Sequence, residues 1–521
     1  MNNDGSHNAS ESSPLIQSNT ETGDVHVHEE IASKRKRRVI LLLYAFAFTM
    51  MLGDNLQPAA LTQIFEGVIC DDYYEMSSWP LTSDGNTTSL TAPPADRCKI
   101  QPVQKELALV RGFQQLVPLI PALLCTVPYG ILAERIGRKG VLILSGAGVF
   151  AAFSWVLVVC YWRFASIRWV LLSGAFLFIG GGDAVSSSLV HIMVTDATDQ
   201  GERAQIFLNL HAADVLSGFL GPAISAPFME KGYTWSVLLL AQIMLFSGTF
   251  LITQFIPETL NLRHKSSTYQ SSTSSSSSSQ ITVSSSRRST SSKLIEIPIR
   301  FVRKVFSLLV VFLGVLTSNR QAVLLLIIFA PQTAARELFT VLGLQYSRAK
   351  FSLPYARGNV LFSLFQGAQG ILVLVLLPIV TRTIAEPLGW TAWARDRRYA
   401  IVSISVMAFG LMVIGFAPNL VIEVAGLLLV ALGSCTTGLL MSLLGGAVRP
   451  NQVSTFYSAA LTLSMVMRSV TGPLLSALLI KGMELGWNWL GLPFLVMAML
   501  MAGVAVASGF IGEDKGVDDS E

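Results

Sequence analysis

The apolar residues of this chain are gathered into blocks of about twenty, and this spacing constrains the fold more than any other feature. A helix needs about 20 consecutive apolar residues to cross the hydrocarbon core of a bilayer. Only 13% of the 521 residues are charged, whereas soluble domains carry roughly 25%. The sequence therefore predicts an all-α polytopic membrane protein and excludes a soluble globular one.

Twelve blocks qualify as membrane spans, and an even number places both termini on the same side. They are residues 39–62, 106–130, 141–161, 169–193, 204–228, 234–256, 320–342, 357–380, 399–417, 419–446, 455–480 and 488–511. A further block at 306–317 holds only a dozen apolar residues after a basic segment. That pattern favours a helix lying in the membrane interface.

Basic residues orient the spans. The clusters at 34–38, 134–139 and 394–398 fall on one face, and the acidic segment 70–75 falls on the other. Lysine and arginine are enriched on the cytoplasmic side, so both termini are expected there. The plasma membrane is the expected location. A vacuolar or endosomal membrane is the alternative, because one segment has the form of an acidic dileucine signal read by sorting adaptors. Its residues are Glu11, Leu15 and Ile16.

The first loop on the outer face carries features of an oxidising compartment. Asn86 begins an Asn-Thr-Thr glycosylation sequence, and Cys70 and Cys98 flank it. The two cysteines are interpreted either as a disulfide or as two free thiols.

A serine-dominated segment within 260–300 cannot bury enough apolar area to fold, so it predicts a linker between two sets of six spans. The expected organisation is a disordered tail, a six-helix bundle, a linker with the interfacial helix, a second six-helix bundle and an acidic tail. Their ranges are 1–38, 39–259, 260–318, 319–512 and 513–521.

The two halves share short repeats. "GPAISA", with Gly221 and Pro222, recurs as "GPLLSA", with Gly472 and Pro473. "VRGF" at 110–113 recurs as "ARGN" at 356–359, and "SGAFLFIGGG" at 173–182 aligns with "AGLLLVALGS" at 425–434. A duplicated six-span unit predicts two pseudo-symmetric bundles with a site between them near the membrane midplane.

The loop after the second span reads "GILAERIGRKG". This segment resembles the signature of the major facilitator superfamily, with Glu at the usual Asp position. The matching residues that we expect to act in gating are Gly130, Glu134, Arg135, Gly137, Arg138 and Lys139. The resemblance implies a twelve-helix transporter in which this acid and these arginines latch the outward-open state on the cytoplasmic side.

The chain as a whole resembles the fungal members of that superfamily. "SGFLGP" at 217–222 is similar to the fifth-span signature of drug–proton antiporters, although Ser217 and Ser225 replace glycines of that pattern. The long first loop is also similar to that of proton-coupled folate-type carriers. The resemblance implies transport driven by a proton gradient, with no other cofactor.

Ionisable residues inside spans are costly and call for a partner or a function. Asp183 lies in the fourth span among glycines and serines, and it is interpreted as a proton carrier facing the cavity or as a structural hydrogen-bonding group. Asp54 and Arg111 are expected to be able to pair, as a clamp or in coupling. Further candidates for the cavity are Asp214, Arg468, Gln332 and Glu337.

These observations predict proton-coupled efflux of small organic molecules, such as xenobiotics or secondary metabolites, by alternating access. One alternative is an importer of an anionic nutrient that uses Arg111 or Arg468. Another is a membrane sensor that does not transport. The sequence offers no recognisable metal cluster, nucleophilic triad or nucleic-acid platform, so neither catalysis, nor a metal, nor a nucleic-acid partner is expected. The expected partners are lipids and a small substrate, bound by a monomer.

Overall fold

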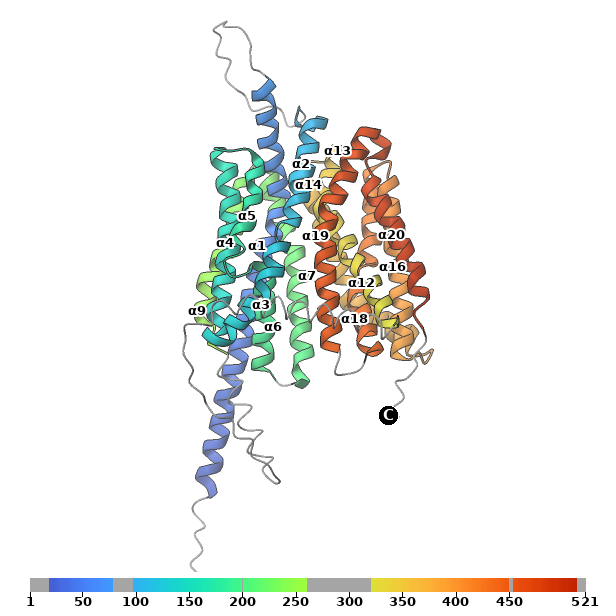
Figure 1. Cartoon of the computed structure of the whole chain (residues 1–521). Helices are drawn as coiled ribbons and strands as arrows, with labels where there is room; N and C mark the ends of the chain where they lie inside the picture. Colours follow the sequence, from blue (N-terminus) through green and yellow to red (C-terminus); the bar gives the residue numbers. More distant parts are fainter. Residues whose placement is uncertain (1–17, 78–96, 199, 260–319, 449–452, 513–521) are drawn as a thin grey trace, which may run out of the picture.

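The computed structural model describes residues 18–77, 97–198, 200–259, 320–448 and 453–512 (Figure 1). In these ranges the chain forms helices and no strand. Several predictions lie outside the described residues: glycosylation at Asn86, the sorting signal, and the structure of the linker and of the acidic tail.

The first half is a series of helices joined by short loops. They are α1 (Ser18–Ser77), α2 (Gln101–Leu116), α3 (Leu119–Ile136), α4 (Arg138–Trp162), α5 (Ser173–Phe176), α6 (Gly182–Ala197), α7 (Gln200–Glu230), α8 (Thr234–Phe246) and α9 (Thr253–Phe255). The second half has the same kind of order. It comprises α12 (Arg320–Leu338), α13 (Leu344–Phe351), α14 (Tyr355–Ile371), α15 (Leu377–Val380), α16 (Ala392–Phe416), α17 (Leu420–Leu432), α18 (Thr436–Ala447), α19 (Val453–Leu485) and α20 (Leu492–Gly509).

Ten helical stretches in the described part are long and apolar enough to cross a membrane. Two shorter apolar stretches, Ile167–Phe176 and Arg320–Ala335, occur where the fourth and seventh spans were predicted. Each is followed by a further helix, α6 and α13 respectively. Each of the twelve predicted spans therefore has a helical counterpart, and the all-α polytopic prediction is confirmed.

The helices form two bundles, each with its own apolar core. In Figure 1 the helices of residues 18–255 lie to the left and those of 320–509 to the right. One buried cluster comes almost entirely from the first half and the other almost entirely from the second. The bundles meet mainly where α7 packs on α14 and α2 packs on α19. We call the end with Cys70 and Cys98 the disulfide end, and the end with residues 130–140 the motif end.

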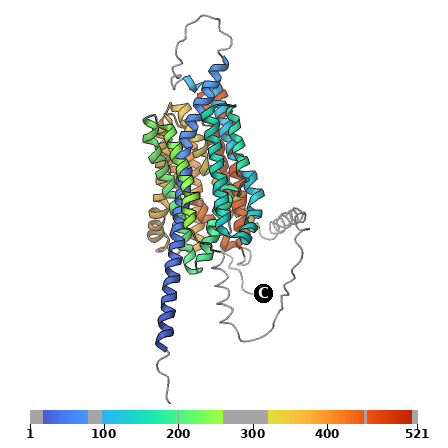
Figure 2. The same cartoon turned by 90° about the vertical axis from the view of Figure 1, so that its left-hand side faces the viewer.

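Helix α1 is longer than expected. It begins at Ser18 and projects from the motif end as a straight extension, so the prediction that residues 18–38 are disordered is wrong (Figure 2). Adding residues to a helix that is already nucleated gains one hydrogen bond per residue, whereas starting a new helix is unfavourable. The helix of the apolar span thus acts as the nucleus from which the helix extends through the polar residues 18–38.

Candidate functional site

The fourth pass is broken next to Asp183. Gly180, Gly181 and Gly182 have φ angles of +79°, +82° and +62°, and α6 begins at the last of them. These values lie in the region that glycine adopts without a steric penalty. A Cβ atom on Gly180 would overlap the backbone of Ser145 in α4, so the break also packs directly on the neighbouring helix. The glycines around Asp183 therefore create a new helix N-terminus inside the membrane-spanning bundle.

Asp183 lies in the first turn of α6. The unsatisfied N–H groups and the positive end of the helix dipole stabilise a carboxylate at such a position. The Asp183 side chain is exposed, as are those of Asp54 on α1 and Arg468 on α19.

Three of the predicted residues come together at this point. The carboxylate of Asp54 is close enough to that of Asp183 for their charges to repel, and Arg468 attracts Asp183. Because Arg468 belongs to the opposite bundle, these exposed side chains face the space between the bundles. Two carboxylates from one half thus meet a guanidinium from the other.

The second half repeats the break without the acid. The tenth pass is interrupted between α17 and α18, and the Ser403 hydroxyl donates to the Gly433 carbonyl there at 2.9 Å. At the start of α18, the Thr436 hydroxyl donates to Oε1 of Gln332 at 3.1 Å. Gln332 is buried, and its Nε2 has no hydrogen-bond partner among the described residues. The second break is therefore lined by neutral polar groups.

Other predicted cavity residues lie elsewhere. Asp214 is half-buried on α7, where its Oδ2 lies 4.0 Å from Nδ1 of His211 on the same helix. Arg111 is buried and donates to Oε1 of Gln114 at 2.9 Å. It lies near Tyr355 instead of Asp54, so the predicted pairing of Asp54 with Arg111 is wrong. The side chain of Glu337 lies outside the described part.

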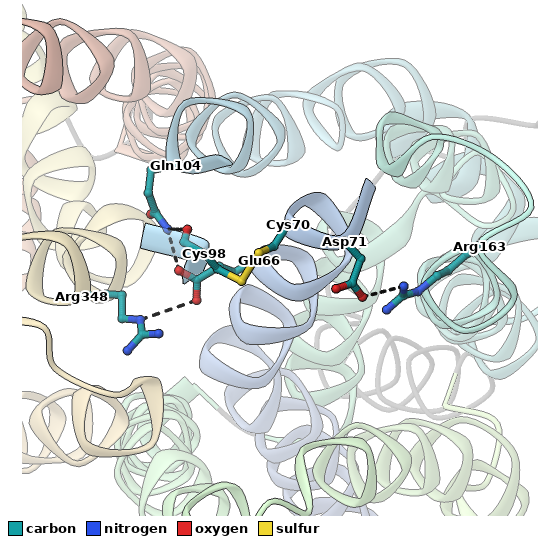
Figure 3. Close-up of a disulfide and its surroundings, with 7 residues drawn as sticks. All are labelled: Glu66, Cys70, Asp71, Cys98, Gln104, Arg163 and Arg348. Atoms are coloured by element: carbon teal, nitrogen blue, oxygen red, sulfur yellow. Dashed lines mark hydrogen bonds and ion pairs between the residues drawn. A yellow bond between two sulfur atoms is a disulfide. The ribbon is translucent and has the colours of Figure 1, made fainter. Parts of the chain in front are cut away.

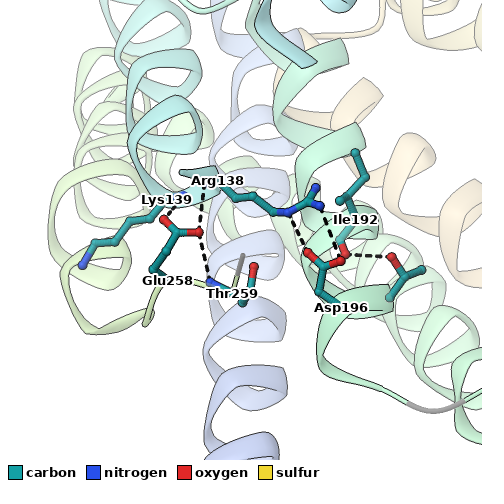
Figure 4. Close-up of polar contacts among 7 residues, drawn as sticks. Arg138, Lys139, Ile192, Asp196, Glu258 and Thr259 are labelled. Carbon is teal, nitrogen blue, oxygen red and sulfur yellow. Dashed lines mark hydrogen bonds and ion pairs between the residues drawn. The ribbon is translucent and has the colours of Figure 1, made fainter. Parts of the chain in front are cut away.

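The loop motif is held by two acids that the sequence analysis missed (Figure 4). Nε of Arg138 lies 2.6 Å from Oδ2 of Asp196 at the end of α6, and both side chains are buried. The Glu258 carboxylate accepts hydrogen bonds from the backbone N–H groups of Arg138 and Lys139, at 3.0 and 3.2 Å. It thereby caps the N-terminus of α4, where an anion is favoured.

Most of the remaining residues of the motif are more exposed to solvent. Gly137 has a φ angle of +106°, and a Cβ atom there would collide with the Glu258 carboxylate. Glu134 and Arg135 are exposed, and Gly130 is half-buried. The motif therefore packs through Gly137 and Arg138 onto its own bundle in this state.

The seams between the bundles are formed by the sequence repeats. In one seam, Nδ2 of Asn359 on α14 donates to the Ser225 hydroxyl and, at 3.3 Å, to the Pro222 carbonyl on α7. In the other, Gly112 of α2 faces Gly472 of α19, and a Cβ atom on either would press on the carbonyl of the other.

The rest of the repeated Gly-Pro segments lies in the same two helices. Gly221 packs against the backbone of Asn55 in α1. Pro473 lies inside α19, as Pro222 lies inside α7.

A buried polar cluster closes the disulfide end (Figure 3). Gln104 of α2 donates to Oε1 of Glu66 at 2.6 Å, and Gln345 of α13 donates to the Gln104 carbonyl at 2.7 Å. Nε of Arg348 lies 3.6 Å from Oε2 of Glu66, and both side chains are less than 10% exposed. The cluster joins α1 and α2 of the first bundle to α13 of the second.

Two covalent and ionic contacts support this cluster. Cys70 and Cys98 form a disulfide, which ties the end of α1 to the start of α2. Lys105 Nζ lies 2.9 Å from Oε1 of Glu484 in the second bundle. These contacts join the two bundles at the disulfide end.

Comparison with known proteins shows which transporters the chain resembles. The family model described as "Sugar (and other) transporter" matches residues 117–270. The chain is 26% identical over 499 residues to the "MFS efflux pump atnC" of Emericella nidulans, covering 95% of this chain and 91% of that protein. It is 25% identical to the "MFS-type transporter avaK" of Aspergillus versicolor, over 86% of each chain. The chain is therefore similar to transporters of the major facilitator superfamily along most of its length.

Solved structures of other transporters share the fold. A point mutant of the nucleoside transporter NupG aligns with a TM-score of 0.57 at 11% identity, covering 91% of this chain and 99% of that one. The human organic anion transporter MFSD10 aligns with a TM-score of 0.51 at 15% identity, over 91% and 99%. The protein is a multi-pass membrane transporter whose two bundles are joined by contacts at the disulfide end.

Proposed function

We propose that this transporter exports small, mostly apolar organic molecules and that a proton gradient drives the export. The direction is supported by relatives named as efflux pumps, atnC of Emericella nidulans and ustT of Aspergillus flavus. Proton use is supported by one arrangement above all: the carboxyl groups of Asp54 and Asp183 are neighbours, and Arg468 of the opposite bundle lies near Asp183.

The proposed coupling follows from this charge arrangement. Two neighbouring carboxylates cannot both stay ionised cheaply, and a nearby guanidinium offsets that cost. Arg468 lies on α19 and moves with the second bundle. When the bundles rock, the distance from Arg468 on α19 to Asp183 on α6 changes, and the carboxylate pair takes up a proton in the state in which that distance is larger. When the bundles return, Arg468 again favours the ionised pair and the proton leaves.

The orientation is part of the proposal. The basic segments 34–38 and 394–398 lie toward the motif end, and basic residues mark the cytoplasmic side. We therefore place the motif end and both termini in the cytoplasm. Because the bundles are joined at the opposite, disulfide end, the arrangement is in this proposal inward-facing, ready to take a substrate from the cytosol or the inner leaflet.

The test uses purified protein in liposomes, with a trapped pH-sensitive dye and rhodamine 6G as a lipophilic probe. We expect Asp183→Asn to abolish rhodamine movement coupled to an imposed proton gradient. Glu386→Gln, which neutralises an exposed carboxylate at the motif end, is the matched control and should transport normally. Full proton-coupled transport by Asp183→Asn would remove this residue from coupling.

A second candidate function rests on Arg468. An exposed guanidinium between the bundles also suits an anionic substrate, so import of an anionic nutrient is the competing proposal. Flux in whole cells separates the two, because overproduction of an exporter lowers the cellular content of the transported molecule and overproduction of an importer raises it.

The protein is further proposed to work as a monomer in the plasma membrane, without a metal, another cofactor, catalytic activity or a nucleic-acid partner. A fluorescent fusion tests the location. Substitution of Leu15 and Ile16 by alanine tests whether sorting adaptors read this signal and direct the protein to the vacuole instead. A chain lacking residues 1–30 should still transport, whereas loss of all function with transport-independent signalling would favour a sensor.

A further inference from the structure

A groove of 310 Å³ runs along the seam between α7 and α14, away from the carboxylate site. Small side chains form its floor: Ala223 and Ala226 from α7 and Ala356 from α14. Pro227 and Val360 form its rim, and both are exposed. The groove is thus apolar, narrow and open to the outside of the bundle.

The groove lies on the membrane-facing surface. Val360 is 53% exposed, and Leu364, one turn further along the same face of α14, is 43% exposed. Phe228, next to the rim on α7, is 44% exposed. Large apolar side chains exposed on a transmembrane helix face lipid, so the occupant of this groove comes from the bilayer.

An exposed ion pair stands at the head of the groove. Nε of Arg357 lies 3.7 Å from Oε1 of Glu230, and their side chains are 68% and 64% exposed. Both residues lie at helix ends, because α7 ends at Glu230 and α14 begins at Tyr355. Tyr233, three residues beyond Glu230, is 58% exposed. Exposed aromatic residues at span ends mark the headgroup level of the bilayer.

We propose that this groove binds a phospholipid with a zwitterionic headgroup. Arg357 binds the phosphate, Glu230 binds the ammonium group, and an acyl chain lies over Ala226 and beside Val360. The seven helical steps from Glu230 to Ala223 span about 10 Å, which accommodates the first part of the acyl chain. The charges match because a zwitterionic headgroup carries one group of each sign, each opposite its counter-ion.

The site has a consequence for the transport cycle. Because α7 and α14 belong to different bundles, the groove exists only while the disulfide end is closed. A ligand that binds one state shifts the equilibrium toward that state. The bound lipid therefore stabilises the arrangement described here.

Native mass spectrometry of the full-length protein with added palmitoyl-oleoyl phosphatidylethanolamine tests the binding. Arg357→Gln removes the phosphate contact, and Val360→Trp fills the groove from its lipid-facing rim without changing a charge. We expect each variant to retain the lipid about tenfold more weakly than the unaltered protein, a change worth about 1.4 kcal/mol. Arg168→Gln is the control, because Arg168 also forms an exposed ion pair, with Glu106, but inside a single bundle.

Unchanged retention in both variants would overturn the proposal, as would equal retention of the anionic phosphatidylglycerol by the unaltered protein. The consequence for the cycle is measured by pulsed electron spin resonance between labels at positions 161 and 421, introduced as Tyr161→Cys and Val421→Cys at the disulfide end. The short-distance population should grow in phosphatidylethanolamine nanodiscs relative to phosphatidylglycerol ones, and less so with Val360→Trp. Equal populations in the two lipids would refute the stabilising role.

Discussion

The side-chain amide of Asn359 donates a hydrogen bond to the Ser225 hydroxyl across the seam between the two bundles. Ser225 belongs to the repeated segment "GPAISA", and its counterpart in "GPLLSA" is Ser476. Ser476 faces Gly112 across the other seam, where a Cβ atom on Gly112 would press on the serine. Gly112 and Asn359 themselves lie in the repeated segments "VRGF" and "ARGN". The repeats that reveal the duplication are thus the surfaces through which the two halves meet.

Loss of the Asn359–Ser225 bond should favour opening of the disulfide end. A buried hydrogen bond contributes about 1 kcal/mol, so Asn359→Ala should raise the population of the state open at the disulfide end about fivefold. Labels at positions 161 and 421 report it as a longer distance. Ser405→Ala removes a hydrogen bond within one helix, to the Ile401 carbonyl, and should leave the distance distribution unchanged. A distribution unaffected by Asn359→Ala would mean that this bond does not hold the seam.

The break in the fourth pass should tolerate no side chain at Gly181. Its φ angle of +82° costs a residue with a Cβ atom roughly 1–2 kcal/mol, and that atom would also meet Val185. Gly181→Ala should therefore lower the thermal unfolding temperature of the purified protein. Gly503→Ala, at a helical glycine with open space around it, should not lower it. Equal unfolding temperatures for the two variants would contradict a strained break.

The buried ion pair of Arg138 and Asp196 should contribute more to the stability of the fold than an exposed ion pair does. Removing one partner of a buried ion pair leaves an uncompensated charge and costs about 3–5 kcal/mol. Asp196→Asn is expected to destabilise the first bundle by that order. Arg168→Gln, which breaks an exposed pair, should cost at most about 1 kcal/mol. Thermal unfolding of both variants measures the two losses of stability. Similar losses would mean that the buried pair stabilises the fold no more than the exposed one.

The disulfide should stabilise the folded chain by restricting the unfolded one. Cys70 and Cys98 are 28 residues apart, and closing a loop of that length contributes about 3–4 kcal/mol in the chain-entropy description. Replacing both cysteines by serine should lower the unfolding temperature. Dithiothreitol should lower it for the unaltered protein and leave that of the double variant unchanged. An effect of dithiothreitol on the double variant would mean that other thiols respond.

The architecture was predictable because it depends on local composition. Runs of apolar residues set the spans, and repeats such as the one containing Ser225 set the duplication. The carboxylate of Asp183 was also recognisable, since an acid among glycines in an apolar span has few roles. The partners of Asp183 were harder to predict. The rotation of each helix about its axis decides which neighbours Asp54 on α1 and Arg111 on α2 face, and the sequence does not fix that rotation. That rotation explains the wrong pairing of Asp54 with Arg111.

Contacts between segments far apart in the chain could not be predicted from the sequence. The pair Glu66–Arg348 joins residues 282 positions apart, and neither position shows a local pattern that names the other. Glu258 and Asp196 were available as acids at the ends of spans, next to a basic loop, and that adjacency is the signal that could have found them. Their geometry arises only when α4, α6 and the end of the sixth pass are packed together.

The 60 residues of α1 form a single helix, which at 1.5 Å per residue is about 90 Å long. Asp54 lies 36 residues from its first residue, Ser18, a lever arm of about 54 Å. A tilt of about 10° at the carboxylate would sweep the far end through about 9 Å, given that rise per residue. A rocking motion that changes the distance between the bundles only slightly therefore displaces the Ser18 end of α1 by much more. A fluorophore attached there could follow single transport cycles.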